Sequence, residues 1–133
     1  MDSTADLPPI PEMKLELVPI PVSDVDRAKA FYELIGFGDV HDTQVSPTMR
    51  VVQFTPPSSA CSIVFGTGMV GISDMVPGSV KGVHLVVKDI HQAREAMVQR
   101  GVAASEVIDL GGVFYSSFDD PDGNAWVLQQ VPW

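Results

Sequence analysis

The chain repeats its own pattern at an interval of about 65 residues, which indicates a duplicated supersecondary unit. The segments 22–37 and 87–102 share the order valine, aspartate, alanine and glycine at the same spacing. Farther along, Phe54 and Phe118 each stand shortly before a proline-containing turn and a last apolar segment. Since whole units recur in register, the fold must accommodate two equivalent halves.

Each copy has the pattern of one strand, one helix and three strands. Alternating apolar residues predict the strands, and apolar residues three and four positions apart predict the helices. Ser23 and Asp26 resemble a helix-capping box, and a glycine ends each helix. We therefore predict an α+β fold of two tandem βαβββ modules. The strands are expected at 14–22, 39–45, 50–54 and 61–65, then at 82–87, 105–110, 113–118 and 125–131, and the helices at 23–35 and 89–100.

A proline-rich tail, residues 1–12, is expected to precede a single domain at 13–133. Module one spans 13–66, a connector rich in glycine and proline spans 67–80, and module two spans 81–133. The 133 residues, 45% of them hydrophobic, suffice for a core without disulfides. The single cysteine, Cys61, lies in an apolar run and is predicted to be a buried, inert thiol.

The charge balance argues against several classes of partner. A net charge of −9 with only 8 lysines and arginines disfavours nucleic acids and anionic membranes, which bind clustered cations. No apolar stretch approaches the roughly 20 residues of a membrane span, and the N-terminus lacks the features of a secretory signal. A cytoplasmic location is therefore expected.

Five motifs follow one another along the chain: Val22-Ser23-Asp24, Ala30-Phe31-Tyr32, Gly36-Phe37, Val87-Lys88-Asp89 and the turn Asp120-Pro121-Asp122-Gly123-Asn124. In order and spacing they resemble the motifs of the vicinal oxygen chelate superfamily, which groups glyoxalases, bleomycin-resistance proteins and extradiol dioxygenases. The resemblance covers Met13 to Pro132. It implies curved sheets that enclose a ligand cavity, commonly at a homodimer interface.

The resemblance also implies where a metal would be bound. The family's ligand positions fall here on Leu17, Gly82 and Val127, with a fourth near Ile63. None of these side chains can ligate a divalent metal. The sequence thus predicts that the usual metal site is absent and that no cofactor is bound.

Two polar residues lie close to the lost ligand positions. His84 is two residues beyond Gly82, and Gln129 is two beyond Val127, so strand alternation places both on the cavity face. They line a ligand pocket, or they ligate a divalent metal at a non-standard site, or His84 acts as a general acid or base. A bulge that turns Glu16 inward in place of Leu17 is a further alternative.

The same alternation predicts the rest of the cavity lining. Phe114 and Phe118 suit the helix-packed face of their strand, so Tyr115 and Ser117 should face the cavity. By symmetry Gln53 should enter it too. The apolar lining is expected to be Leu17, Pro19, Ile63, Phe65 and Val127, and the polar lining His84, Gln129, Gln53, Ser117 and Tyr115. Trp126 is expected in the core, and Trp133 near the dimer edge.

Other polar residues have simpler explanations. His41 and His91 are predicted to be solvated surface histidines. The aspartates of the Asp119–Asp122 segment suit a tight turn better than a calcium site. No nucleophilic triad and no phosphate-binding glycine loop is visible.

Three functions remain open from the sequence. The first is metal-independent binding of a small hydrophobic or aromatic molecule in a homodimer. The second is a glyoxalase-like lyase or isomerase in which His84 moves a proton and Gln129 or Tyr115 steadies an oxyanion. The third is an accessory subunit of the same fold that binds no ligand.

Overall fold

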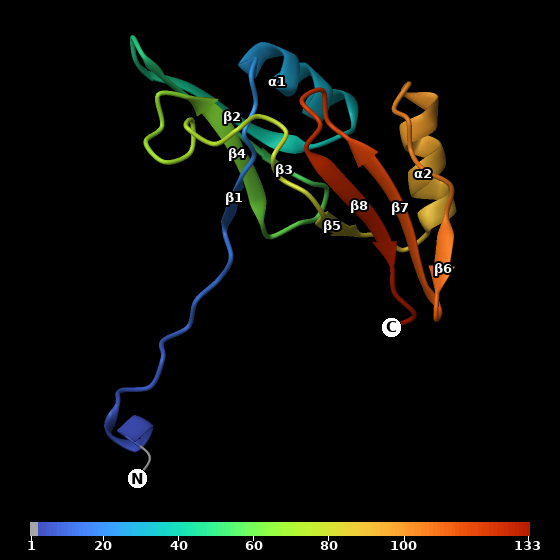
Figure 1. Ribbon diagram of the computed structural model, residues 1–133, viewed down its shortest axis with the longest axis horizontal. Helices are drawn as coiled ribbons and strands as arrows, with labels where there is room; N and C mark the ends of the chain where they lie inside the picture. The colour runs from blue at the N-terminus through green and yellow to red at the C-terminus, as the bar shows by residue number, and fades with distance from the viewer. Residues whose placement is uncertain (1–2) are drawn as a thin grey trace.

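Two four-stranded mixed sheets, one in each module, form the framework of the protein over residues 3–133, the part described by the computed structural model (Figure 1). The first sheet has the order β1-β4-β3-β2 and the second the order β5-β8-β7-β6, so the strands of both modules are arranged alike. The predicted fold of two tandem βαβββ modules is confirmed. The strands are β1 (Leu17–Pro19), β2 (Gly38–Ser46), β3 (Met49–Thr55), β4 (Ser62–Thr67), β5 (Val83–Val86), β6 (Ile108–Leu110), β7 (Val113–Asp119) and β8 (Ala125–Gln130).

The strand β1 is shorter than the predicted 14–22. It pairs in parallel with β4, as β5 pairs in parallel with β8. Pro19 and Pro21 have no N–H to donate to a ladder, so regular pairing ends early. Residues 3–16, including the short 3₁₀ turn η1 (Ser3–Asp6), extend away from the two sheets (Figure 1).

One helix packs on each sheet, α1 (Val25–Leu34) on β3 and β4, and α2 (Ile90–Gln99) on β7 and β8. Each helix begins after an aspartate cap: Asp24 accepts a hydrogen bond from the Arg27 amide, and Asp89 accepts one from the Gln92 amide. The predicted cap at Ser23 was wrong by one residue. The Ser23 hydroxyl instead donates to Asp122 in the second module.

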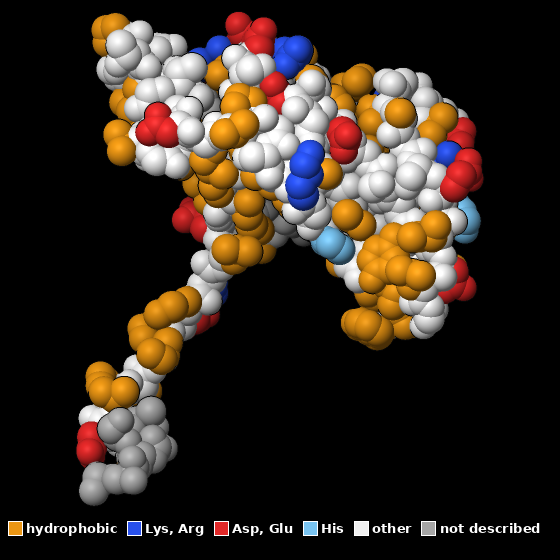
Figure 2. All heavy atoms as spheres, in the orientation of Figure 1, with side chains coloured by type: hydrophobic (Ala, Val, Ile, Leu, Met, Phe, Trp, Pro, Cys, Tyr) orange, Lys and Arg blue, Asp and Glu red, His pale blue; other side chains and the backbone are white. Residues whose placement is uncertain are grey.

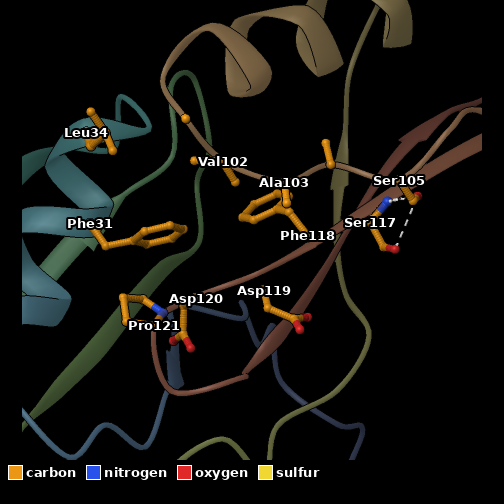
Figure 3. A pocket seen from close by; sticks show the side chains of 12 residues that line it. Phe31, Leu34, Val102, Ala103, Ser105, Ser117, Phe118, Asp119, Asp120 and Pro121 are labelled. Carbon is orange, nitrogen blue, oxygen red and sulfur yellow. Dashed lines mark hydrogen bonds between the residues drawn. The ribbon is translucent and has the colours of Figure 1, made fainter.

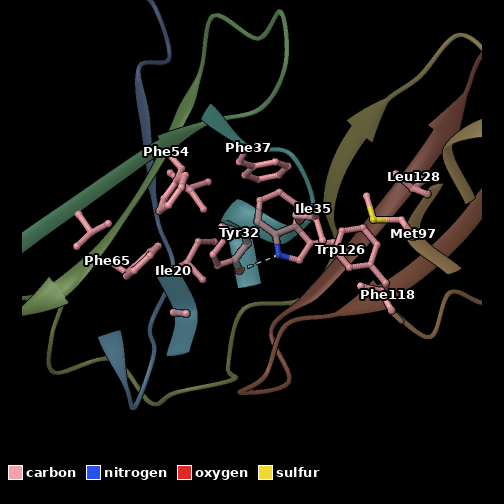
Figure 4. Close-up of a cluster of buried hydrophobic side chains, with 14 of the residues drawn as sticks. Ile20, Tyr32, Ile35, Phe37, Phe54, Phe65, Met97, Phe118, Trp126 and Leu128 are labelled. Carbon is pink, nitrogen blue, oxygen red and sulfur yellow. Dashed lines mark hydrogen bonds between the residues drawn. The ribbon is translucent and has the colours of Figure 1, made fainter. Parts of the chain in front are cut away.

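A cluster of aromatic side chains fills the space between the two modules (Figure 4). Tyr32 on α1 lies at its centre, with ring centroids 5.7 Å from Phe65 of the first sheet and 5.9 Å from Trp126 of the second. Trp126 is 1% exposed, which confirms its predicted place in the core. One helix of module one therefore packs against both sheets and holds the modules together.

A buried carboxylate anchors this cluster. Asp120 accepts hydrogen bonds from the Tyr32 hydroxyl at 2.8 Å and from Asn124 Nδ2 at 2.8 Å, and the Trp126 indole donates to the Tyr32 oxygen at 3.1 Å. Burial and the nearby Asp120 charge raise the pKa of Tyr32 above its ordinary value. The turn at 120–124 is thus the polar joint between the modules.

Among residues 3–133, no helix combines the length and apolar character needed to cross a membrane.

Candidate ligand-binding site

The candidate site lies on the second sheet, on the face turned away from α2. We call this side of each sheet its helix-free face. In the second sheet Trp126, Leu128 and Phe118 point toward the core, so the residues that alternate with them point the other way. The side chains on the helix-free face are His84, Val86, Ile108, Leu110, Tyr115, Ser117, Val127 and Gln129.

A groove of about 370 Å³ is hollowed into this face. Its walls are mostly apolar, and Ile108 and Leu110 of β6 form one side of it. Hydrophobic side chains gather at this end of module two, where Val86, Ile108, Leu110 and Trp133 are exposed (Figure 2). A groove of this size and composition suits a small apolar ligand. The residues that line it are His84, Ser105, Ile108, Leu110, Tyr115, Ser116, Ser117 and Val127.

The imidazole of His84 is held in place by the backbone. Its Nδ1 lies 2.6 Å from the carbonyl oxygen of Gly82, two residues earlier in the sequence and just before β5 begins. The Tyr115 ring meets the imidazole edge-on, with centroids 6.3 Å apart and an interplanar angle of 88°. These two contacts fix one polar and one aromatic side chain side by side in the groove.

Serines form the polar end of the groove. The Ser117 amide donates to Ser105 Oγ at 2.9 Å, and the two hydroxyls lie 3.3 Å apart. Ser116, on the core side of β7, donates its hydroxyl to the Ser105 carbonyl at 2.7 Å. Ser105 therefore ties the segment before β6 to β7 and sets the position of the Ser117 hydroxyl.

The structure brings four of the predicted site residues together in this groove: His84, Tyr115, Ser117 and Val127. Gln129 lies next to them on β8, directly opposite Tyr115 in the ladder. Sequence reasoning missed Ser105, Ile108 and Leu110. The alternation of Ile108 and Leu110 about Asp109 could have revealed the last two, since Ile108 pairs with Tyr115.

Three other predicted residues lie on the helix-free face of the first sheet. Pro19 pairs with Val64, which pairs with Gln53, and Leu17 pairs with Ser62 on the same face. The β1–β4 ladder runs without a bulge from Leu17 to Pro19, so Glu16 does not replace Leu17 there. None of these residues lines the groove of the second sheet within one chain.

The sequence assigned Ile63 and Phe65 to the cavity, and the structure corrects this. Both are at most 3% exposed and belong to the core beneath α1, where Phe65 packs on Tyr32. The counterpart of Val127 is Val64, because Val127 pairs with Ser117 as Val64 pairs with Gln53. The predicted alignment of the two modules was wrong by one residue here, so the prediction assigned these side chains to the wrong face of the sheet.

A larger groove of about 600 Å³ lies between α1 and the segment 101–105 (Figure 3). Its floor includes Phe31 and Phe118, whose ring centroids are 6.4 Å apart. Its one buried charge, Asp120, already binds Tyr32 and Asn124. This groove is more spacious than the first, but its polar side chains are Asp119, the engaged Asp120 and the serines Ser105 and Ser117, which line both grooves. It has no imidazole or phenol group, so we favour the groove at His84.

The residues around His84 do not fit a divalent metal. The remaining groove side chains near it offer hydroxyl groups and apolar surface rather than imidazole, thiolate or carboxylate ligands. Over residues 3–133, no three His, Cys, Asp or Glu side chains are grouped so that they could hold a metal ion. His41 and His91, predicted as surface residues, are both exposed and lie outside the groove.

Comparisons with known proteins agree with this architecture. Residues 14–128 match the family model of the Glyoxalase/Bleomycin resistance protein/Dioxygenase superfamily. No curated protein matches the chain.

Several solved structures are similar over nearly their whole length. TnmS3, an antibiotic binding protein from Streptomyces sp. CB03234, is 30% identical with a TM-score of 0.78, covering 92% of this chain and 98% of its own. A glyoxalase/bleomycin resistance protein from the same Streptomyces is 32% identical, with a TM-score of 0.73 and coverage of 88% and 100%. A member of the superfamily from Sphaerobacter thermophilus DSM 20745 is 30% identical, with a TM-score of 0.77 and coverage of 90% and 98%.

Proposed function

Because the chain belongs to the glyoxalase/bleomycin resistance protein/dioxygenase superfamily, we propose that it binds a small hydrophobic or aromatic molecule without the metal site of the metal-using members. The observation that carries this proposal is the groove on the second sheet, in which apolar walls surround His84, Tyr115 and Ser117. Mostly apolar walls with a few orienting polar groups are typical of small-molecule sites. The likeness to TnmS3, described as an antibiotic binding protein, supports the same function.

The groove is open on one side, and we propose that a second copy of the chain covers it. Val86, Ile108 and Leu110 are 67%, 52% and 62% exposed beside the groove, which is unusual for neighbouring apolar residues on a free surface. The first sheet of a second copy would cover this apolar surface and bring its Leu17, Pro19 and Gln53 to the ligand. A homodimer of this kind has two enclosed cavities, and we expect it to act in the cytoplasm.

One observation favours catalysis as a second candidate. The bond between His84 Nδ1 and the Gly82 carbonyl leaves Nε2 free to act as a base toward a ligand in the groove. A lyase or isomerase would also need a group that stabilises the developing negative charge. Tyr115 and Gln129 are the residues placed to do so.

Calorimetric titration of aromatic compounds with two to four fused rings tests the binding function. Each titration is run with and without a chelator, and binding is expected in both. Val127→Arg fills the groove and should abolish binding. Val98→Arg, a matched change on the exposed side of α2, should leave it intact.

Two results would contradict the proposal. Loss of binding in chelator would point to a metal at His84 and Gln129. Equal binding by Val127→Arg and the unaltered protein would place the ligand outside the groove. Recovery of a chemically altered ligand, with a loss of turnover of about 10² to 10⁴ in His84→Ala, would establish catalysis.

A further inference from the structure

The backbone fixes which nitrogen of His84 carries the proton. Nδ1 lies 2.6 Å from the Gly82 carbonyl oxygen, and a carbonyl oxygen can only accept hydrogen bonds. The proton of the neutral ring must therefore reside on Nδ1. Nε2 is then left with a lone pair and no proton.

The lone pair on Nε2 is available to a ligand. Among residues 3–133, His84 makes its hydrogen bond through Nδ1 alone, and the ring lies exposed at the groove beside Tyr115. Ring rotation that placed Nε2 elsewhere would break the bond to Gly82 and the edge-on contact with Tyr115. The site thus presents a fixed acceptor, and a ligand that binds here must bring a donor.

The lining of the groove restricts the charge of that donor. Its side chains include no Asp, Glu, Lys or Arg. An ammonium or carboxylate bound against Ile108, Leu110 and Val127 would lose its hydration without gaining an opposite charge, which is strongly unfavourable. The donor that meets His84 is therefore neutral.

The shape of the groove restricts the body of the ligand. Val127 and Tyr115 lie on adjacent strands of one sheet face, and Ile108 is paired with Tyr115 on the next strand. Side chains on adjacent strands form a broad surface that a flat ring system can cover. The Tyr115 ring, edge-on to His84, adds an aromatic contact for such a ring system.

From these constraints we infer that the ligand is a neutral, flat aromatic compound that donates a ring-borne hydroxyl or N–H group to Nε2 of His84. This inference rests on the proposed binding function and names the class of molecule that the groove selects. His84 acts here as a specificity-determining residue. The acceptor favours compounds with a free hydroxyl over analogues in which that hydroxyl is capped.

The tautomer can be tested first, without any ligand. Long-range ¹H–¹⁵N correlation spectra of the histidine side chains at pH 8 distinguish a proton on Nδ1 from a proton on Nε2. We expect the Nδ1–H form for His84. A dominant Nε2–H form would overturn the inference, because the groove would then present a donor.

A matched pair of probes tests the ligand class. 2-Naphthol has a free hydroxyl, and 2-methoxynaphthalene is nearly the same shape with the hydroxyl capped. From the net value of a neutral hydrogen bond, 2-naphthol should bind about five- to tenfold more tightly. His84→Phe should remove this preference, whereas His91→Phe, on the exposed face of α2, should retain it.

The outcomes separate this inference from the proposed function. Equal affinity of the two probes, with amide shifts confined to β7 and β8, would overturn the donor inference and leave the binding function standing. Failure of both probes to perturb the groove at millimolar concentration would overturn the binding function for aromatic ligands, and the inference with it. A preference that survives His84→Phe would assign the acceptor to another residue and also overturn the inference.

Discussion

The two modules share a scaffold but differ on the faces that could meet a ligand. The caps Asp24 and Asp89 have the same geometry, with φ of −137° and −134°. The helix-free faces have diverged. By ladder position His84, Ser117, Tyr115 and Gln129 of the second sheet correspond to Pro19, Gln53, Val51 and Gly66 of the first. A duplicated fold can thus have the same helix caps in both modules and yet place an aromatic and an imidazole side chain on the helix-free face of only one.

The turns before the last strand of each module differ in the same way. In module two Asp120 binds Tyr32 and Asn124 in the interior. Two residues after Phe54, the corresponding position in module one is Pro56, which has no side-chain donor or acceptor. The carboxylate of the polar joint is therefore supplied by the turn of module two alone.

Removal of this joint should have the largest effect on stability. Asp120→Ala leaves the Tyr32 hydroxyl and the buried Asn124 amide without their acceptor, and each unpaired buried group costs about 1–3 kcal/mol. We expect a loss of about 3 kcal/mol in the free energy of unfolding, measured by urea denaturation. The neighbouring exposed residue gives the control, since Asp119→Ala should cost under about 0.5 kcal/mol. Equal losses in the two variants would show that the joint does not stabilise the fold.

The same joint predicts how stability changes at alkaline pH. Burial and the Asp120 charge raise the pKa of Tyr32 in the folded state above that of the unfolded chain, about 10. Above that pH the unfolded chain binds fewer protons than the folded one, so stability falls as pH rises. The expected slope is about 1.4 kcal/mol per pH unit from this group.

Urea denaturation between pH 9 and 11 measures this slope. Tyr32→Phe removes the titrating group, so its stability should depend less on pH in this range, although it is less stable overall. Tyr115→Phe should keep the slope of the unaltered protein. A Tyr32→Phe variant with an unchanged slope would assign the alkaline transition to other groups.

The sequence predicted the scaffold well because its signals are local. Alternation, helical spacing and glycine stops placed all eight strands and both helices of residues 3–133. The cap of α1 is Asp24 and not the predicted Ser23, because the Ser23 hydroxyl is engaged in a tertiary hydrogen bond to Asp122. No local pattern reveals a partner 99 residues away.

The candidate site was harder to predict, for two physical reasons. Face assignments depend on strand register, and a shift of one residue moved Ile63 and Phe65 from the core to the predicted cavity. Ser105 precedes its strand and reaches the groove only through its contacts with Ser116 and Ser117. Loop positions of this kind have no sequence periodicity, so only the structure reveals them.

The divergence of the two faces predicts which substitution would disrupt the proposed dimer. Ile108→Glu places a charge on the exposed apolar surface beside the groove, which the proposed second copy would bury. We expect the dimer dissociation constant, measured by sedimentation velocity, to rise at least about tenfold. Val70→Glu, at a 97% exposed position on the connector, should have no effect. If both variants dimerise equally well, the groove is not covered by a second copy.

Replacing a groove residue with its counterpart from the first sheet tests whether ligand binding depends on the residues that differ between the two faces. Tyr115→Val introduces the side chain found at Val51, the corresponding position of the first sheet. It removes the aromatic contact with His84, so 2-naphthol should bind about fivefold more weakly. Fluorescence or calorimetric titration measures the change. Unchanged affinity would mean that the ring contributes packing to β7 and not to the ligand.

The helix caps, which the two modules share, predict equal effects in both modules. Asp24→Ala and Asp89→Ala each remove a cap whose oxygen lies 3.0 and 3.1 Å from the amide that it accepts. Each should cost about 1 kcal/mol of unfolding free energy. Asp74→Ala, at an exposed position in the connector, controls for loss of charge. If only one cap variant is destabilised, the two helices are not energetically equivalent, and the repeat has diverged in its scaffold as well as in its groove.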